Sequence, residues 1–189
     1  MIRIGILGDI GSGKSYVAKN FGYPVFNADM EVSMLYKKDR KIFYKLKKKL
    51  PKYFSSFPIY KDQVSYAIMD NKNNLKKIIS IIHLEIRKKM KSFLEKNKNK
   101  KIVVLDIPLL LENKINKKND ILIFVQSKKS DIMKRLKKRK NFNLKLLNQF
   151  RKAQLPLDYK KHLSKFVVKN NFTNNSVKKD INFILNKIL

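Results

Sequence analysis

The stretch Gly8-Asp9-Ile10-Gly11-Ser12-Gly13-Lys14-Ser15 decides the fold of this chain of 189 residues. It fits the pattern G-x-x-x-x-G-K-[ST] of a phosphate-binding loop. The apolar residues Ile2, Ile4, Ile6 and Leu7 before it predict a buried strand, and residues 16–21 after it predict a helix that ends at Gly22 in a left-handed turn. A loop between a strand and a helix N-terminus directs backbone N–H groups at one point, where a phosphate can bind.

The composition limits the class of protein. The chain has no cysteine, which excludes disulfides and thiolate metal sites and suits a reducing compartment. No apolar run approaches the roughly 20 residues that span a bilayer. Residues 1–4 lead directly into the first strand without the pattern of a secretory signal. We therefore expect a single-domain cytoplasmic protein without a membrane partner, as a monomer or weak homo-oligomer.

The net charge of +31 raises the question of a nucleic-acid partner. Most of the excess is lysine, spread along the whole chain, and only six residues are arginine. Base edges and bidentate phosphate contacts favour arginine, so we expect no dedicated nucleic-acid partner. The positive field would still attract small anionic substrates.

The order of predicted elements indicates an α/β protein. Strands are predicted at 2–7, 24–26, 102–105, 121–125 and 166–168, and helices at 16–21, 31–36, 37–52, 63–69, 75–95, 130–140, 143–153 and 176–189. Strands that alternate with helices predict a doubly wound parallel sheet of five strands. We expect a core of about 1–36, 100–127 and 164–189, a helical substrate-binding insertion of about 37–99, and a helical lid of about 128–160.

Polar residues follow the predicted strands at the carboxyl edge of the sheet, where ligands bind in this architecture. Lys14 would reach the β- and γ-phosphates of a nucleotide, and the Ser15 hydroxyl would ligate Mg²⁺. Asp106 ends an apolar strand and resembles a carboxylate that holds Mg²⁺ directly or through water; the alternative is a carboxylate in a strand-end turn. Asp29 could accept the proton of an acceptor hydroxyl, or it could cap a helix that begins at Met30.

Two further groups of residues suit an anionic substrate. His83 and Arg87 share one face of a predicted helix and could bind an anionic acceptor. The alternative is a partly buried histidine and a solvated arginine. Half of the arginines lie in the predicted lid, where they could stabilise a phosphoryl group during transfer: Arg135, Arg139 and Arg151. Glu112 suits a capping or surface role as well as a functional one.

Several motifs, in order along nearly the whole chain, resemble the dephospho-CoA kinase family. They are the phosphate-binding loop, Pro24-Val25-Phe26-Asn27-Ala28-Asp29, Ile82-His83-Leu84-Glu85-Ile86-Arg87, Val103-Val104-Leu105-Asp106-Ile107-Pro108-Leu109-Leu110-Leu111-Glu112, Gln154-Leu155-Pro156-Leu157 and Phe166-Val167-Val168-Lys169-Asn170. The Asp-x-Pro-Leu-Leu-x-Glu segment is the most diagnostic of them.

The resemblance implies a P-loop kinase fold and phosphorylation of the ribose 3′-hydroxyl of dephospho-CoA by ATP with Mg²⁺. It favours Asp29 as the catalytic carboxylate, with Lys14 and Arg139. Residues 8–15, Tyr16 and Asn170 would bind ATP, and the acceptor contacts would be Asp29, His83, Arg87, Asp106 and Pro108.

The chain departs from the family at four positions: Asn27 replaces the usual first Asp of Asp-Ala-Asp, Leu84 a Pro, Lys165 an Asp and Phe172 a Gly. Another small-molecule or nucleotide kinase is the nearest alternative. A basic nucleic-acid-binding module that depends on nucleotide is a further one.

Overall fold

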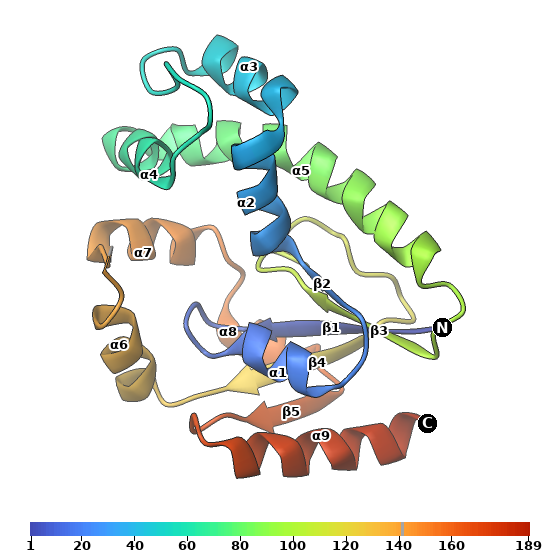
Figure 1. The fold of residues 1–189 in the computed structure, drawn as a ribbon. Helices are drawn as coiled ribbons and strands as arrows, with labels where there is room; N and C mark the ends of the chain where they lie inside the picture. The colour runs from blue at the N-terminus through green and yellow to red at the C-terminus, as the bar shows by residue number, and fades with distance from the viewer. Residues whose placement is uncertain (141) are drawn as a thin grey trace. The chain divides into compact units, whose positions relative to one another are not determined.

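The five predicted strands form one parallel sheet in the order β2-β3-β1-β4-β5 (Figure 1). The strands are β1 (Ile2–Gly8), β2 (Val25–Asn27), β3 (Ile102–Asp106), β4 (Ile121–Gln126) and β5 (Phe166–Lys169). This computed structural model describes residues 1–140 and 142–189, apart from the side chain of Asn174. The predicted fold class is confirmed.

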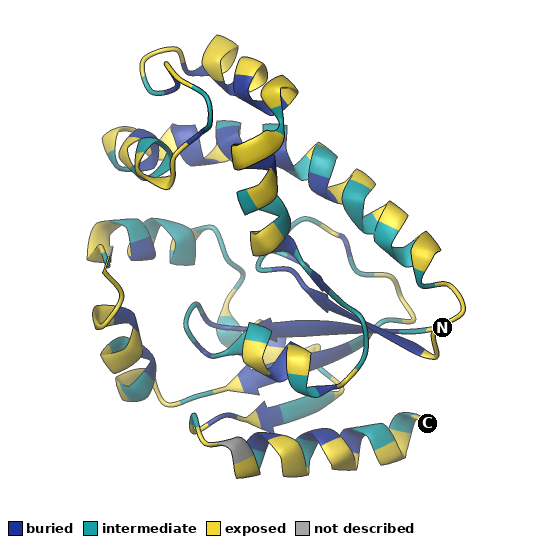
Figure 2. Cartoon of the chain, viewed as in Figure 1, coloured by how far each residue is buried: buried dark blue, intermediate teal, exposed yellow. Residues whose placement is uncertain are grey.

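The sheet is covered on both faces, as its continuous apolar strands predict. Ile4 and Ile6 of β1 pack in one buried cluster with α1 (Lys14–Asn20) and α9 (Asn174–Ile188). On the other face, Gly5 lies close to Leu110, and α8 (Leu157–His162) packs against β1 and β4. Figure 2 shows the three central strands, β3, β1 and β4, as almost continuously buried.

The register brings the predicted polar residues to one edge. Asn27 at the end of β2 pairs directly with Asp106 at the end of β3, and Gly8 of β1 pairs with Val125 of β4. The phosphate-binding loop, Asn27 and Asp106 therefore leave the sheet at its carboxyl edge.

The described residues of the predicted lid, about 128–160, form α6 (Lys129–Lys137), α7 (Leu144–Lys152) and the first part of α8, a third helix that packs against the sheet. The sequence predicted only two, because α8 is short and its polar sequence lacks a clear apolar stripe. Residue 141 of the predicted lid lies outside the described residues.

The chain forms two compact units: residues 1–27 with 97–189, and residues 28–96. The second contains α2 (Ala28–Lys38), α3 (Arg40–Lys49), α4 (Lys61–Asp70) and α5 (Lys72–Lys96), and the other three helices all contact α5. Ile78, Ile82 and Ile86 are buried along α5 at the four-residue spacing that predicts an apolar stripe, whereas Met90, the next residue of that stripe, is half-buried. This unit begins at Ala28, whereas the predicted insertion begins at about residue 37, because α2 is continuous from Ala28 and packs against α5.

Candidate active site

The phosphate-binding loop adopts a backbone that its glycines make possible. Gly8, Gly11 and Gly13 have φ angles of +146°, +86° and +91°, values that side chains disfavour. The Lys14 Nζ donates hydrogen bonds to the carbonyl oxygens of Gly8 (3.2 Å) and Asp9 (2.9 Å). The loop therefore holds its own ammonium group against the backbone that would surround a phosphate.

Two residues that directly follow β4 and β5 support the phosphate-binding loop with side-chain hydrogen bonds. Asn170 is 2% exposed, and its Nδ2 donates to the Ser12 carbonyl at 2.8 Å. The same carbonyl accepts from the Ser127 hydroxyl at 3.0 Å. The Asn170 Oδ1 accepts from the Phe172 N–H at 2.9 Å. Asn170 was expected to bind ATP, and its side chain is occupied in supporting the loop. Ser127 was not predicted, because a serine after a strand carries no distinctive signal.

A small polar cluster lies beside the loop. The Asn27 Nδ2 donates to the Asp106 Oδ2 at 2.6 Å and to the Ser15 Oγ at 3.4 Å. Asp106 is 3% exposed, so its carboxylate is withdrawn from water and hydrogen-bonded by the amide. The structure thus brings together Ser15 and Asp106, the two residues predicted to hold a metal. Asn27, which replaces the usual Asp of the family, donates a hydrogen bond to each of them.

The oxygen atoms of this cluster fit Mg²⁺, which prefers hard oxygen ligands such as hydroxyl and carboxylate. Among the described residues, no three His, Cys, Asp or Glu side chains are grouped to hold a metal ion. Ser15 and Asp106 would therefore supply only part of a coordination shell. This is usual for Mg²⁺ that shares its remaining ligands with substrate phosphates and water.

The predicted lid packs directly on the loop. A methyl group at Gly11 would lie 3.0 Å from the Leu136 Cγ and 3.1 Å from the Ile132 Cγ2, both on α6. These two residues and Leu147 of α7 form a buried cluster, against which Ile10 of the loop packs. The loop and the predicted lid therefore share one apolar contact.

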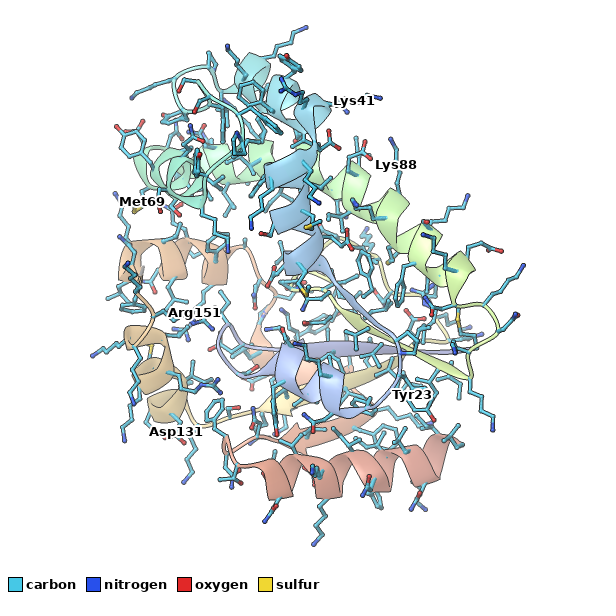
Figure 3. The ribbon with its side chains drawn as sticks, in the orientation of Figure 1. Tyr23, Lys41, Met69, Lys88, Asp131 and Arg151 are labelled. Atoms are coloured by element: carbon cyan, nitrogen blue, oxygen red, sulfur yellow. The ribbon has the colours of Figure 1, made fainter. Side chains whose placement is uncertain are left out.

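The three predicted lid arginines have different surroundings. The Arg135 guanidinium stacks on the Phe172 ring, with 4.1 Å between its Cζ and the ring centroid. Arg139 lies exposed just beyond α6. Arg151 forms an ion pair with Asp9 of the loop. Figure 3 shows that its side chain leaves the end of α7 on the side of the loop.

Glu112 has a structural environment. Its Oε1 accepts from the Leu155 N–H at 2.9 Å and pairs with the Lys160 Nζ at 2.6 Å. Lys160 is 1% exposed, so the carboxylate compensates a buried ammonium group. These contacts favour an anchoring role for Glu112 in the connection from α7 to α8.

The predicted acceptor residues lie in the helical unit, apart from Asp106 and Pro108. Asp29 lies in the first turn of α2, which begins at Ala28, so it is not the N-cap residue of that helix. His83 and Arg87 are in contact on α5, with 3.3 Å between the Arg87 Nε and the His83 Nε2. Partial burial and the Arg87 charge lower the pKa of His83 from its ordinary value. Pro108 is half-buried in the turn after β3.

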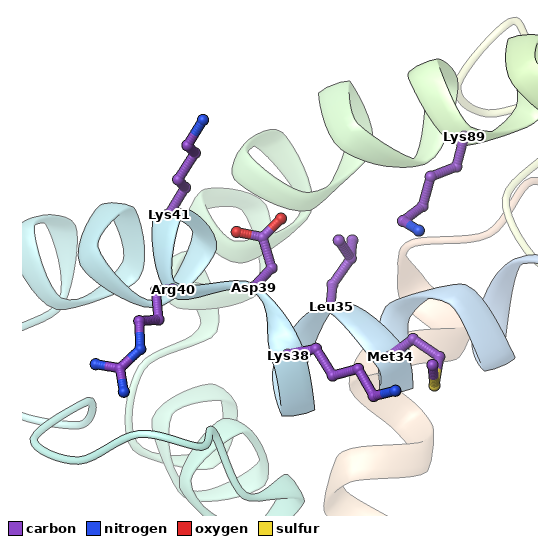
Figure 4. A pocket seen from close by; sticks show the side chains of 7 residues that line it. All are labelled: Met34, Leu35, Lys38, Asp39, Arg40, Lys41 and Lys89. Carbon is purple, nitrogen blue, oxygen red and sulfur yellow. The ribbon is translucent and has the colours of Figure 1, made fainter.

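The helical unit also carries an open hollow of about 590 Å³ (Figure 4). It is lined by Met34, Leu35, Lys38, Asp39, Arg40, Lys41 and Lys89. The side chain of Asp39 caps α3 by accepting from the Ile42 N–H, and Lys89 pairs with Glu31 at 3.0 Å. Figure 4 shows cationic groups that diverge instead of converging on one point. The lysines and the arginine that line the hollow make this surface positive, but they do not form a defined anion site.

Comparisons with known proteins identify the family. A family model described as dephospho-CoA kinase matches residues 2–176. The chain belongs to the dephospho-CoA kinase family. A dephospho-CoA kinase of Wolbachia sp. subsp. Brugia malayi is 34% identical over 170 residues, which are 87% of each chain. The activity of the chain is therefore that of a dephospho-CoA kinase, which catalyses the final step of coenzyme A biosynthesis. The family implies ATP as a substrate.

Two solved structures share the fold of this dephospho-CoA kinase family member. TT1252 from Thermus thermophilus superimposes with a TM-score of 0.79 at 24% identity. The superposition covers 100% of this chain and 98% of the TT1252 chain. The dephospho-CoA kinase from Campylobacter jejuni has a TM-score of 0.62 at 18% identity, with 98% of this chain and 96% of that chain covered.

No helix in the described part of the chain is long and apolar enough to cross a membrane.

Proposed function

We propose that the chain transfers the γ-phosphoryl group of ATP to the ribose 3′-hydroxyl of dephospho-CoA, with Mg²⁺ held by Ser15 and Asp106. The observation that carries this proposal is the cluster of Ser15, Asn27 and Asp106 beside the glycine loop, with N–O separations of 3.4 and 2.6 Å. A bound Mg²⁺ would neutralise charge on the phosphates and hold their oxygens in place.

The loop and the lid would stabilise the charge that spreads over the phosphoryl oxygens during transfer. Lys14 already lies against the loop carbonyls, so only a short movement of its ammonium group would bring it to a phosphate. Arg139 is exposed just beyond α6, and its guanidinium would pair with the phosphoryl oxygens. Such positioning and charge stabilisation supply most of the acceleration in phosphoryl transfer.

Asp29 would accept the proton of the acceptor hydroxyl as the new O–P bond forms. Its place in the first turn of α2, two residues after Asn27, and its match to the family motif support this role. His83 and Arg87 would bind the acceptor. A lowered pKa keeps His83 neutral near pH 7, so Arg87 would supply the positive charge and the imidazole a hydrogen bond.

The variant Asp29→Asn tests the assignment of the proton acceptor. We expect kcat to fall by about 10²- to 10⁴-fold, the usual contribution of a general base, with little change in the Kd for ATP. Asp62→Asn is the matched control, because Asp62 is an exposed carboxylate in the first turn of α4. A kcat of Asp29→Asn equal to that of this control would remove Asp29 from the mechanism.

The variant Arg87→Ala tests the acceptor site. We expect the KM for dephospho-CoA to rise more than the KM for ATP, because Arg87 is assigned to the acceptor alone. Lys91→Ala removes an exposed positive charge from the same helix and controls for the general field. Equal increases in both KM values, or the same effect in Lys91→Ala, would contradict the assignment.

A further inference from the structure

The phosphate-binding loop contains a carboxylate, and the lid neutralises it. The Asp9 side chain is only 9% exposed. Its Oδ2 accepts from the Arg151 Nη2 at 2.6 Å, and its Oδ1 accepts from the Arg151 Nε at 3.2 Å. The Oδ1 also accepts from the Ile10 N–H at 2.7 Å. Arg151 thus grips the carboxylate with two donors, the strong bidentate geometry of an arginine–carboxylate pair.

A negative charge at this position would weaken the binding of phosphate groups by the loop. The Asp9 carbonyl bonds to Lys14 and to the Ser12 N–H, so Asp9 belongs to the backbone that would surround the phosphates. The carboxylate is withdrawn from water, and salt screens a buried charge much less than an exposed one. Without compensation it would repel every phosphate charge that enters the loop.

We propose that Arg151 is a positioning residue for ATP binding that acts through Asp9: it cancels the carboxylate charge so that the loop accepts a triphosphate. This inference rests on the proposed function, which places ATP at the loop. Arg151 differs in this respect from Arg139, whose proposed partner is the phosphoryl group itself. The negative charge of Asp9 is tolerated in the loop only while the guanidinium from α7 remains on it.

The double-mutant cycle of Asp9→Asn and Arg151→Gln tests this inference with ATP as the ligand. Arg151→Gln leaves the carboxylate uncompensated, and we expect the Kd for ATP to rise about tenfold or more, because the repulsion between like charges a few ångströms apart in a protein site exceeds the free energy of a tenfold change in Kd. Asp9→Asn should bind ATP more tightly than Arg151→Gln, because it leaves no uncompensated carboxylate in the loop. The double variant should return to within about threefold of the wild type, because neither charge remains.

The dependence on ligand charge separates this role from a purely structural one. The loss in Arg151→Gln should be larger for ATP than for ADP and absent for adenosine. Lys152→Gln is the matched control, because it removes one exposed positive charge from the adjacent residue. It should leave all three affinities nearly unchanged. Urea unfolding of each variant shows whether Arg151→Gln is folded, and the Asp9→Asn arm remains informative if it is not.

Four outcomes would overturn the inference. A double variant as weak as Arg151→Gln would mean that Arg151 contacts the nucleotide directly. An Asp9→Asn variant as weak as Arg151→Gln would mean that the pair is a mechanical link. An Arg151→Gln variant that binds ATP normally would mean that the carboxylate needs no compensation, and an equal loss for adenosine would indicate a structural role.

The variant Lys14→Ala separates failure of this inference from failure of the proposed function. If Lys14→Ala binds ATP as tightly as the wild type does, the loop is not the ATP site, and the proposed function and the inference are both refuted. A normal loss in Lys14→Ala, combined with no recovery in the double variant, would refute the inference alone.

Discussion

Gly13→Ala should damage the chain far more than an ordinary glycine substitution. The φ angle at Gly13 is +91°, and an added methyl group would lie 2.2 Å from the Asn170 Nδ2. The left-handed backbone costs alanine about 1–2 kcal/mol. Relief of the overlap must displace Asn170, which leaves buried hydrogen-bonding groups unsatisfied at about 1–3 kcal/mol. We expect a total loss of about 2–5 kcal/mol in the free energy of unfolding.

Gly22→Ala is the matched control for this prediction. Gly22 has a φ of +72°, but nothing lies within 4 Å of its added methyl group, so only the backbone cost of about 1–2 kcal/mol applies. Urea unfolding of both variants gives the two free energies, and titration with ATP should show a loss of affinity only for Gly13→Ala. Equal destabilisation of the two variants, with normal ATP affinity in both, would refute the account of Asn170 as a brace.

Two further predictions concern the polar cluster and the acceptor helix. In Asn27→Asp, two carboxylates would meet where the amide now lies 2.6 Å from Asp106. At pH 7 with EDTA the free energy of unfolding should fall by about 1–3 kcal/mol, and Mg²⁺ should restore it. A variant as stable as the wild type in EDTA would contradict the contact. Burial and Arg87 lower the pKa of His83, so the unfolded chain binds a proton more readily. The wild type should therefore lose stability relative to His83→Gln as pH falls below about 6.5 and through the lowered pKa. Parallel unfolding curves over pH 7.5–5 would refute this.

The sequence predicts the sheet and its functional edge because both depend on local signals. Each strand is an apolar run, and polar residues follow it directly, as Asn27 follows Val25 and Phe26. The loop motif fixes the position and direction of the first strand and helix. The helical unit is less well bounded, because nothing near Ala28 shows that α2 will pack against α5.

The side-chain partners in the site depend on contacts between distant parts of the chain. Asp9 and Arg151 are 142 residues apart, and Asn170 is 158 residues from Ser12. Neither separation leaves a periodic pattern. Lys160 is another case, since it resembles the many solvated lysines of this chain and is nevertheless 1% exposed. A motif identifies which residues matter, whereas tertiary packing decides what they touch.

Turnover of dephospho-CoA by the full chain tests the central claim most directly. The purified protein, ATP and Mg²⁺ are incubated with dephospho-CoA, and the product is compared with authentic coenzyme A by chromatography and mass spectrometry. Coenzyme A should form with the wild type, and its formation should be abolished in Lys14→Ala and by EDTA. Phosphorylation of a nucleoside monophosphate or another small acceptor, with no coenzyme A formed from dephospho-CoA, would contradict the account.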